Sequence, residues 1–194
     1  MPTATSVSEI IRRRRSVFPK HYVPGRPVER SLIEELLENA NRAPTHKLTQ
    51  PWRFRVFHSP ESREHLARHM ELFFQNNTPA EQFSEEKMKR SGDNPRRAAA
   101  VIALLLHPDP LAKLPEWEEV AALAMCVQNM WLTCTAYDLG CYWSSPKAAL
   151  EGGAIFDLEE GERCMGLFYL GWHEAPSGLP PSTRTPVGDK TKWY

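Results

Sequence analysis

The sequence lacks net charge. Its 24 lysine and arginine residues balance 24 aspartate and glutamate residues, so no overall field draws the chain toward nucleic acid or an anionic membrane. No window approaches 18 uninterrupted apolar residues, and a membrane-spanning helix is therefore not expected. The first eight residues are polar and lead into a run of arginines, so no secretory signal peptide is expected either.

Cysteine is scarce and shows no pattern. The sequence has four, with neither CxxC spacing nor the density of a secreted disulfide framework: Cys126, Cys134, Cys141 and Cys164. Reduced thiols fit this usage best. The expected location is therefore cytoplasmic.

The common catalytic motifs are also missing. The sequence contains no GxSxG, no GxGxxG and no GxxxxGK[ST]. His65 and His69 are four residues apart, but Leu66 stands where a zinc protease needs glutamate. Glu118 and Glu119 are adjacent on a predicted helix, so their carboxylates diverge. With no evident nucleophile or metal cage, an enzyme of this sequence would take its reactive atom from an organic cofactor.

What the sequence does have is enough apolar material for one folded domain. It has 194 residues, of which 41% are hydrophobic, and this length predicts a single domain over residues 1–194. Its 17 prolines are about twice the usual share. Most of them fall between periodic segments, where the missing amide hydrogen is tolerated. The last 22 residues, 173–194, are proline-rich and end in Trp193-Tyr194, which predicts an extended carboxyl-terminal arm.

Hydrophobic periodicity predicts helices and strands in alternation. A continuous apolar run at 98–106 indicates a central strand buried on both faces. The charged stretch 79–97 predicts a short helix and a mobile loop that could cover a pocket. Without regular βαβ spacing, the pattern favours an α+β domain with a mixed, mainly antiparallel sheet flanked by helices. The first expected helix ends near residue 15, and the others span about 33–43, 61–77, 116–138 and 147–150. The expected strands span 52–58, 98–106, 141–144 and 165–171.

The arginines at the end of the first predicted helix are the first candidate for function. Arg14 continues the apolar stripe of Val7, Ile10 and Ile11, so it should face the body of the protein, as should Arg15. A partly buried guanidinium needs a fixed anion, and phosphate suits its bidentate fork. The alternative is a pair of structural salt bridges to glutamates at position 9, 34 or 38. The residues alone leave both open.

Two polar loops are further candidates. The segment from Arg42 to Trp52 holds cationic, hydroxyl, imidazole and amide groups between Pro44 and Pro51, which suits recognition of a polar ring edge or a ribityl chain. Trp143-Ser144-Ser145-Pro146 forms a second small polar turn after a predicted strand.

These motifs, in this order, resemble the FMN-dependent nitroreductase family over roughly residues 8–172. The resemblance rests on Arg14-Arg15-Ser16, on Ala43-Pro44 through Gln50-Pro51-Trp52, and on Gly166-Leu167-Phe168-Tyr169-Leu170-Gly171. Pro115-x-Trp117-Glu118 at the start of the long helix is similar to a short bacterial branch of that family. The resemblance implies an intertwined homodimer with one FMN at each end of the interface.

The resemblance also implies roles for particular residues. Arg14, Arg15 and Ser16 would hold the phosphate and ribityl chain of FMN. The flavin would also contact residues of the two polar loops, in part in the site of the partner subunit: Arg42, His46, Trp143, Ser144 and Ser145. The chain departs from the family at Leu48, where an asparagine is usual, and at the basic residue after the last strand, which could be Arg184 or Lys190.

The implied reaction is a ping-pong transfer of electrons from NADH or NADPH to a nitroaromatic, quinone or similar acceptor, with the flavin carrying the chemistry and no protein residue as a catalytic group. The missing GxGxxG motif agrees, because a nicotinamide that visits the flavin briefly needs no Rossmann domain. Alternatives are a flavoenzyme of the same fold with other chemistry, such as dehalogenation or flavin cleavage, and a flavin-binding or interaction protein without turnover.

Overall fold

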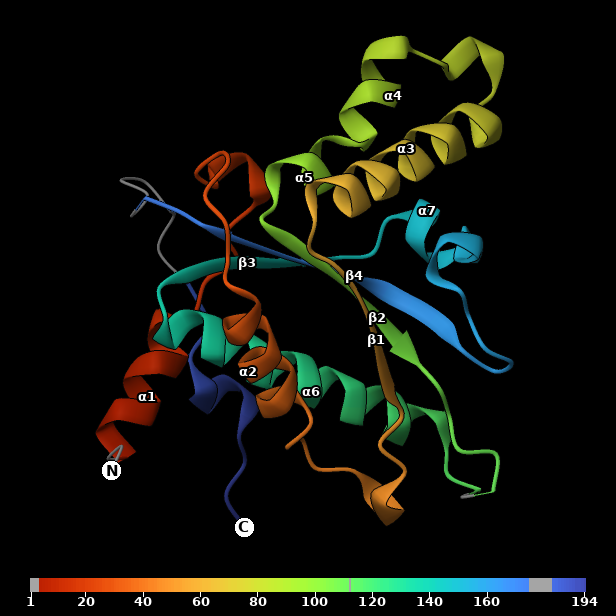
Figure 1. The fold of residues 1–194 in the computed structure, drawn as a ribbon. Coiled ribbons are helices and arrows are strands. Elements are labelled where there is room, and N and C mark those ends of the chain that lie inside the picture. The colour runs from red at the N-terminus through yellow and green to blue at the C-terminus, as the bar shows by residue number, and fades with distance from the viewer. Residues whose placement is uncertain (1–3, 112, 175–182) are drawn as a thin grey trace.

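The structure is a computed structural model that describes residues 4–111, 113–174 and 183–194, except the side chains of residues 4 and 5 (Figure 1). The helices are α1 (Ala4–Arg13), α2 (Arg30–Ala40), α3 (Pro60–Asn77), α4 (Glu85–Ser91), α5 (Asp93–Arg97), α6 (Glu116–Ala136) and α7 (Lys147–Leu150). The strands are β1 (Trp52–Phe57), β2 (Ala100–Leu106), β3 (Leu139–Ser144) and β4 (Arg163–Trp172). Single turns of 3-10 helix are η1 (Pro19–His21), η2 (His46–Leu48), η3 (Ala80–Gln82), η4 (Gly153–Phe156) and η5 (Val187–Lys190).

The four strands form one antiparallel sheet in the order β1-β2-β4-β3. β2 lies in the interior of this sheet, and every one of its residues is buried. The continuous apolar run predicted as a central strand is therefore confirmed, as is the α+β fold with a mainly antiparallel sheet. β1 is an edge strand, so one row of its backbone groups pairs with no other strand in the described chain.

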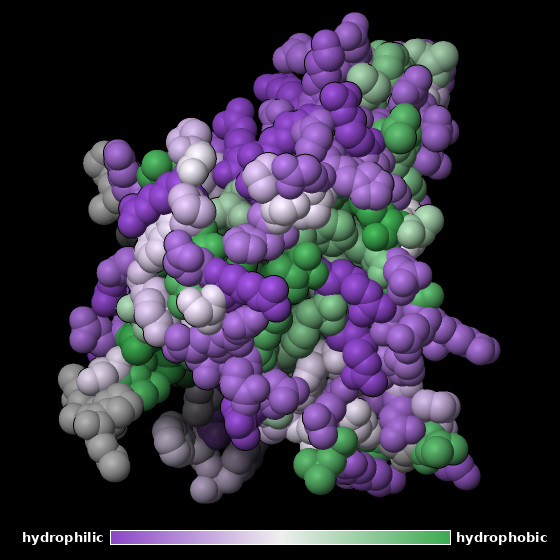
Figure 2. Space-filling view, in the orientation of Figure 1, coloured by the Kyte–Doolittle hydropathy of each residue, from purple (hydrophilic) through white to green (hydrophobic). Residues whose placement is uncertain are grey.

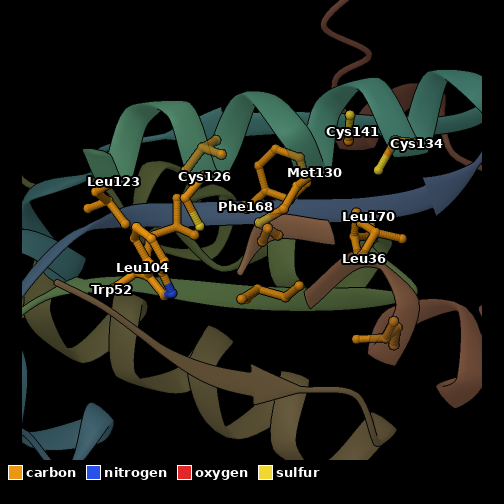
Figure 3. Packing of buried hydrophobic residues seen from close by; sticks show 14 of the residues in the cluster. Leu36, Trp52, Leu104, Leu123, Cys126, Met130, Cys134, Cys141, Phe168 and Leu170 are labelled. Atoms are coloured by element: carbon orange, nitrogen blue, oxygen red, sulfur yellow. The ribbon is translucent and has the colours of Figure 1, made fainter. Parts of the chain in front are cut away.

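Alternation along the strands produces two hydrophobic cores. Ile102 and Leu104 of β2 face α2 and α6, while Val101 and Ala103 face the opposite side, where α3 and α7 pack. Figure 3 shows α6 lying over the sheet, with Leu123, Cys126 and Met130 directed toward Phe168 and Leu104. The sheet is thus a middle layer between two layers of helices.

Helix α6 is the longest element, and the sequence predicted it with nearly these bounds. Helix α2 runs antiparallel to it. The Tyr137 hydroxyl, just after α6, donates a hydrogen bond to Glu35 at 2.8 Å. Further along α2, the Asn39 side-chain amide donates to Thr133 Oγ1 at 3.1 Å. The loop that follows α2 continues toward the first turn of α6. One long helix therefore sets the positions of several loops that carry polar side chains.

The first helix is shorter and more exposed than predicted. It ends at Arg13, although the Arg14 amide still donates to the Ile10 carbonyl at 2.9 Å. Val7 and Ile11 are 48% and 52% exposed, so the expectation that their stripe faces the body of the protein is wrong for these two residues in the single chain. Figure 2 shows hydrophobic side chains near α1 and η2 as well as a larger hydrophobic area across the middle of this face.

Residues 79–97 fold into the 3-10 turn η3 and two short α-helices rather than one helix and a loop. Ser84 caps α4 by accepting a hydrogen bond from the Lys87 amide, and Arg96 pairs with the carboxylates of Glu64 and Glu71 on α3. The Arg96 ion pairs hold α5 against α3. That the segment acts as a lid stays a prediction.

The predicted arm, residues 173–194, is described only in part, because residues 175–182 lie outside the described residues. Residues 183–194 are exposed throughout, and Trp193 is 94% exposed. Helix α1 and the carboxyl-terminal residues 183–194 both lie on the α6 side of the sheet (Figure 1). Among the described helices, none is long and apolar enough to cross a bilayer.

Candidate functional site

Arg14 is held half-buried against helix α6. Its guanidinium carbon lies 5.1 Å from the centroid of the Trp131 ring, within the range of a cation–π contact. Burial lowers the pKa of Arg14 from its ordinary value, and the positive charges of Arg184 and Arg15 lower it further, against an opposing effect of Cys141. In the described part of the chain, no carboxylate pairs with Arg14. Three guanidinium groups thus lie near one another with no protein anion on the central one.

The turn after α1 is held by contacts with β3 and with Asp138, the residue just before it. Arg13 forms an ion pair with Asp138 at 2.5 Å, and the Val17 amide donates to the Cys141 carbonyl at 3.0 Å. Phe18 then packs on Tyr142, with ring centroids 4.4 Å apart. Arg14, Arg15 and Ser16 therefore lie beside the beginning of β3.

Two of the three glutamates expected as alternative salt-bridge partners of Arg14 and Arg15 pair with other arginines instead. Glu34 pairs with Arg30, and Glu38 pairs with Arg42. Arg15 donates to the backbone carbonyls of Arg12 and Arg14, at 2.8 and 2.9 Å. The glutamates of α2 are therefore engaged elsewhere. Arg42 already has an anionic partner, which makes it a weaker candidate for an external anion than Arg14.

His46 lies in η2 and faces the first turn of α6, where its Nδ1 atom is 2.5 Å from the Glu118 carboxylate. The loop around it is locally strained, because Lys47, Leu48 and Gln50 all have positive φ angles of about 50°. Thr45 supports this conformation, since its hydroxyl oxygen accepts the Gln50 amide at 3.2 Å. Leu48, at the position where the sequence departs from the family pattern, is 77% exposed.

The third group of predicted residues lies at the far end of β3. Trp143 packs against the α6 core and donates from its indole nitrogen to the Met165 carbonyl at 3.2 Å. Ser144 is half-buried and Ser145 is exposed. Beside them, Pro146 and Lys147 form part of the wall of a cavity of about 420 Å³ between α3 and α7.

A close backbone approach shapes this end of β3. Gly166 has φ of +131°, and a Cβ atom there would lie 2.5 Å from the Ser144 carbonyl and 2.6 Å from the Trp143 indole nitrogen. Only glycine fits such a position without displacing its neighbours. The register of β2 against β4 also shifts beside it, between Leu104 and Leu105. The Gly166 backbone thereby sets the position of Trp143 and Ser144.

Helix α6 separates two of these groups. His46 meets Glu118 in its first turn, and Arg14 meets Trp131 thirteen residues later. At 1.5 Å per residue, the two contacts are about 20 Å apart along the helix. The Arg14 and Trp143 groups, in contrast, lie along the same strand, β3. The Arg14 group lies beside the beginning of β3 and the Trp143 group at its far end. One chain therefore leaves the three groups apart, with His46 near the opposite end of α6 from Arg14.

Sequence reasoning missed the two α6 residues that position these groups. The sequence places Trp131 within the predicted helix 116–138 and Glu118 in the Pro115-x-Trp117-Glu118 motif, but neither pattern indicates a contact with Arg14 or His46. The spacing of Pro115, Trp117 and Glu118 was a signal for Glu118, but nothing in the local sequence shows that Trp131 lies under Arg14.

Comparisons with known proteins agree with the fold and the order of the motifs. Residues 11–172 match the model of the nitroreductase family. YfhC of Bacillus subtilis, whose name classes it provisionally as an NAD(P)H nitroreductase, is 28% identical over 185 residues, which cover 94% of this chain and 91% of YfhC.

Solved structures resemble the whole chain. A nitroreductase-like protein from Bacillus cereus superposes with a TM-score of 0.78 and 28% identity, over 100% of this chain and 98% of its own. A Desulfovibrio desulfuricans protein, described provisionally as a nitroreductase and solved in complex with FMN, superposes with a TM-score of 0.71 and 24% identity, over 99% of this chain and 98% of its own. The second likeness concerns the fold.

Proposed function

Because the chain belongs to the nitroreductase family, we propose that it is an FMN-dependent oxidoreductase that takes electrons from NADH or NADPH and passes them to a nitroaromatic, quinone or similar acceptor. Two comparisons support the parts of this proposal. A relative over most of the chain is named for NAD(P)H nitroreductase activity, and a protein of the same fold was solved with FMN. The residues of this chain must still fit that cofactor.

The observation that carries the proposal is the condition of Arg14. Its half-buried guanidinium lies over the Trp131 ring and close to Arg15 and Arg184. No carboxylate of the described residues pairs with it. A phosphate group satisfies this requirement, because its oxygens accept bidentate charge-assisted hydrogen bonds from a guanidinium. Arg14 would therefore hold the FMN phosphate, with Arg15, Ser16 and Arg184 beside it.

The 20 Å between the Arg14 and His46 contacts supports a site shared by two subunits. The outward side of α6 carries a stripe at positions 117, 121, 124, 125 and 128, in which Trp117 is 69% and Met125 40% exposed. If two copies of α6 pair in opposite directions through this stripe, the His46 end of one lies beside the Arg14 end of the other. A homodimer would then hold two flavins, each between Arg14 of one chain and His46 and Arg42 of its partner.

FMN, when bound, supplies a two-electron carrier that NAD(P)H and the acceptor reach in turn, which is a ping-pong order. The residues of this chain would bind FMN and orient it. The arginines around Arg14 place positive charge near the phosphate, at about 1.5–3 kcal/mol for each charge-assisted hydrogen bond. Trp143 packs beneath the polar turn that ends in Ser144 and Ser145, which would face the flavin. Solvent can supply the protons, so no side chain is required as an acid or base.

The first test is the cofactor of the purified protein. We expect a yellow protein that releases FMN on denaturation at about one molecule per chain. Under anaerobic conditions NADH or NADPH should bleach the flavin absorption, and a quinone or nitroaromatic should restore it. A protein that stays colourless after FMN addition would contradict the proposal. Bound FMN that neither nicotinamide reduces would instead indicate a flavin-binding protein without turnover.

A further inference from the structure

A second polar cluster lies at the end of the sheet where β2 ends and β4 begins. His107 follows directly on β2, Glu162 directly precedes β4, and Glu159 lies in the turn before it. One ligand atom from each of these three residues lies within 4.8 Å of the other two. The pairing of Leu106 with Arg163 places the two strand ends opposite one another, so the fold itself brings His107 to Glu162.

Two atoms of this cluster are buried without a hydrogen-bond partner. They are Glu162 Oε1, on a side chain that is only 1% exposed, and His107 Nδ1. A buried carboxylate oxygen without a partner is costly, because it has lost its water and gained nothing in return. The two atoms face one another at 3.7 Å, which is longer than the 2.7–3.2 Å or so of a hydrogen bond.

The distance between His107 Nδ1 and Glu162 Oε1 suits two ligands of one metal ion. Zinc lies about 2.0–2.2 Å from histidine nitrogen and carboxylate oxygen, so two such ligands at a tetrahedral angle are roughly 3.3–3.6 Å apart. The observed distance exceeds this by a small fraction of an ångström. Glu159 is exposed, so its side chain is free to complete the set.

The other oxygen of Glu162 is fixed in a way that leaves Oε1 available. Glu162 Oε2 accepts a hydrogen bond from Arg55 at 2.9 Å and from the Glu159 amide at 3.0 Å. Arg55 also donates to the carbonyls of Phe156 and Asp157, which anchors the turn. Ligating carboxylates in metal sites are oriented by such outer hydrogen bonds. Arg55 neutralises one of the two carboxylates, and one negative charge remains to attract a cation.

We propose that His107, Glu159 and Glu162 form a binding site for a divalent transition-metal ion, with zinc as the best match to one imidazole and two carboxylates. The ion would tie the turn at 159–162 to the segment after β2. Its role would be structural: His107 also donates its amide to the Pro51 carbonyl at 2.7 Å, so the same tie holds the beginning of β1. The competing explanation is a protonated histidine that pairs with Glu162 and binds no metal.

Zinc binding to the full-length, FMN-loaded protein separates these explanations. After chelator treatment and equilibrium dialysis against Zn²⁺, metal analysis should find one tightly bound zinc per chain, and zinc should raise the unfolding temperature. His107→Gln should abolish both effects. Glu159→Gln replaces an exposed carboxylate with a neutral amide of the same shape, and the Glu159 side chain makes no hydrogen bond or ion pair within the described residues. The variant should therefore fold normally and weaken zinc binding at least about tenfold.

Two control variants exclude zinc bound elsewhere. Glu160→Gln changes the neighbouring exposed carboxylate, which is outside the cluster, and His65→Gln removes one of the two histidines spaced four apart on α3. Both should keep the wild-type stoichiometry. X-ray absorption should show nitrogen and oxygen ligands without sulfur. Zinc binding that survives in His107→Gln and Glu159→Gln, or an unfolding temperature that depends on pH but not on zinc, would overturn the proposal.

Discussion

The guanidinium of Arg14 stands over the indole ring of Trp131, 5.1 Å from its centroid, and the two residues are 117 positions apart in the sequence. The contact holds a charged side chain against an apolar helix. It also leaves the polar edge of the guanidinium free to meet an anion. The proposed phosphate site thus depends on a pairing that only the folded chain creates.

Replacing Arg14 should weaken FMN binding more than replacing its exposed neighbour Arg12. Arg14→Ala removes at least one charge-assisted hydrogen bond, which corresponds to a loss of at least about 10-fold in affinity. Arg12→Ala should change the affinity less than about threefold, because Arg12 lies on the outer side of α1. Titration of the apoprotein with FMN, followed by quenching of flavin fluorescence, measures both. Equal losses in the two variants would show that Arg14 has no special role.

A mixed dimer tests whether the site is shared between subunits. Arg14→Ala and His46→Ala should each bind FMN poorly as homodimers. A heterodimer of the two, purified with two different affinity tags, contains one site with both residues intact and one with neither. It should recover about half of the wild-type flavin content. If both residues served the flavin within one chain, the heterodimer would recover nothing.

The close contact at Gly166 predicts a large effect of a single methyl group. Gly166→Ala should lower the free energy of unfolding by more than the 1–3 kcal/mol or so that an unfavourable backbone conformation costs, because its Cβ also collides with Trp143 and Ser144. Gly25→Ala is the matched control. Gly25 also has positive φ, +71°, but nothing lies within 4 Å of a Cβ there. Urea unfolding of both variants separates the cost of the backbone conformation from the cost of the steric collision. Equal destabilisation would mean that the neighbours of residue 166 move aside without cost.

The buried thiols predict a loss of stability in alkaline solution. Burial raises the pKa of Cys126 to about 12 and that of Cys164 to about 11, from an ordinary value of 9.0. The folded state holds these protons more tightly than the unfolded chain. The resulting stability is therefore fully present below about pH 9 and is lost as the pH rises toward 11–12.

Urea unfolding at pH 8 and pH 10 should show this loss, and the folded protein at pH 8 should react slowly with a thiol reagent. All four cysteines are free and buried, so labelling should require unfolding. Rapid labelling of the native protein would contradict the burial of these thiols.

Local sequence patterns predicted most of the elements but few of the contacts between them. The apolar run of β2 and the long stripe of α6 could be read directly, because periodicity reports which faces are buried. The end of α1 could not, since the ion pair of Arg13 with Asp138 and the docking of Val17 on β3 involve distant segments. For the same reason, the sequence named His46 and Arg14 as candidates but did not show that α6 holds them at opposite ends. His107 and Glu162 meet only through the register of β2 with β4.

The separation of thirteen positions between Glu118 and Trp131 in α6 fixes a length that insertions or deletions cannot change in small steps. Adding or deleting one residue there would shift the two ends by 1.5 Å and rotate one against the other by about 100°. Either change would turn a contact of Arg14 or His46 away from its partner. Surface segments such as 79–84 face no such requirement. Homologues of this chain should therefore vary in length outside α6 and keep this interval constant.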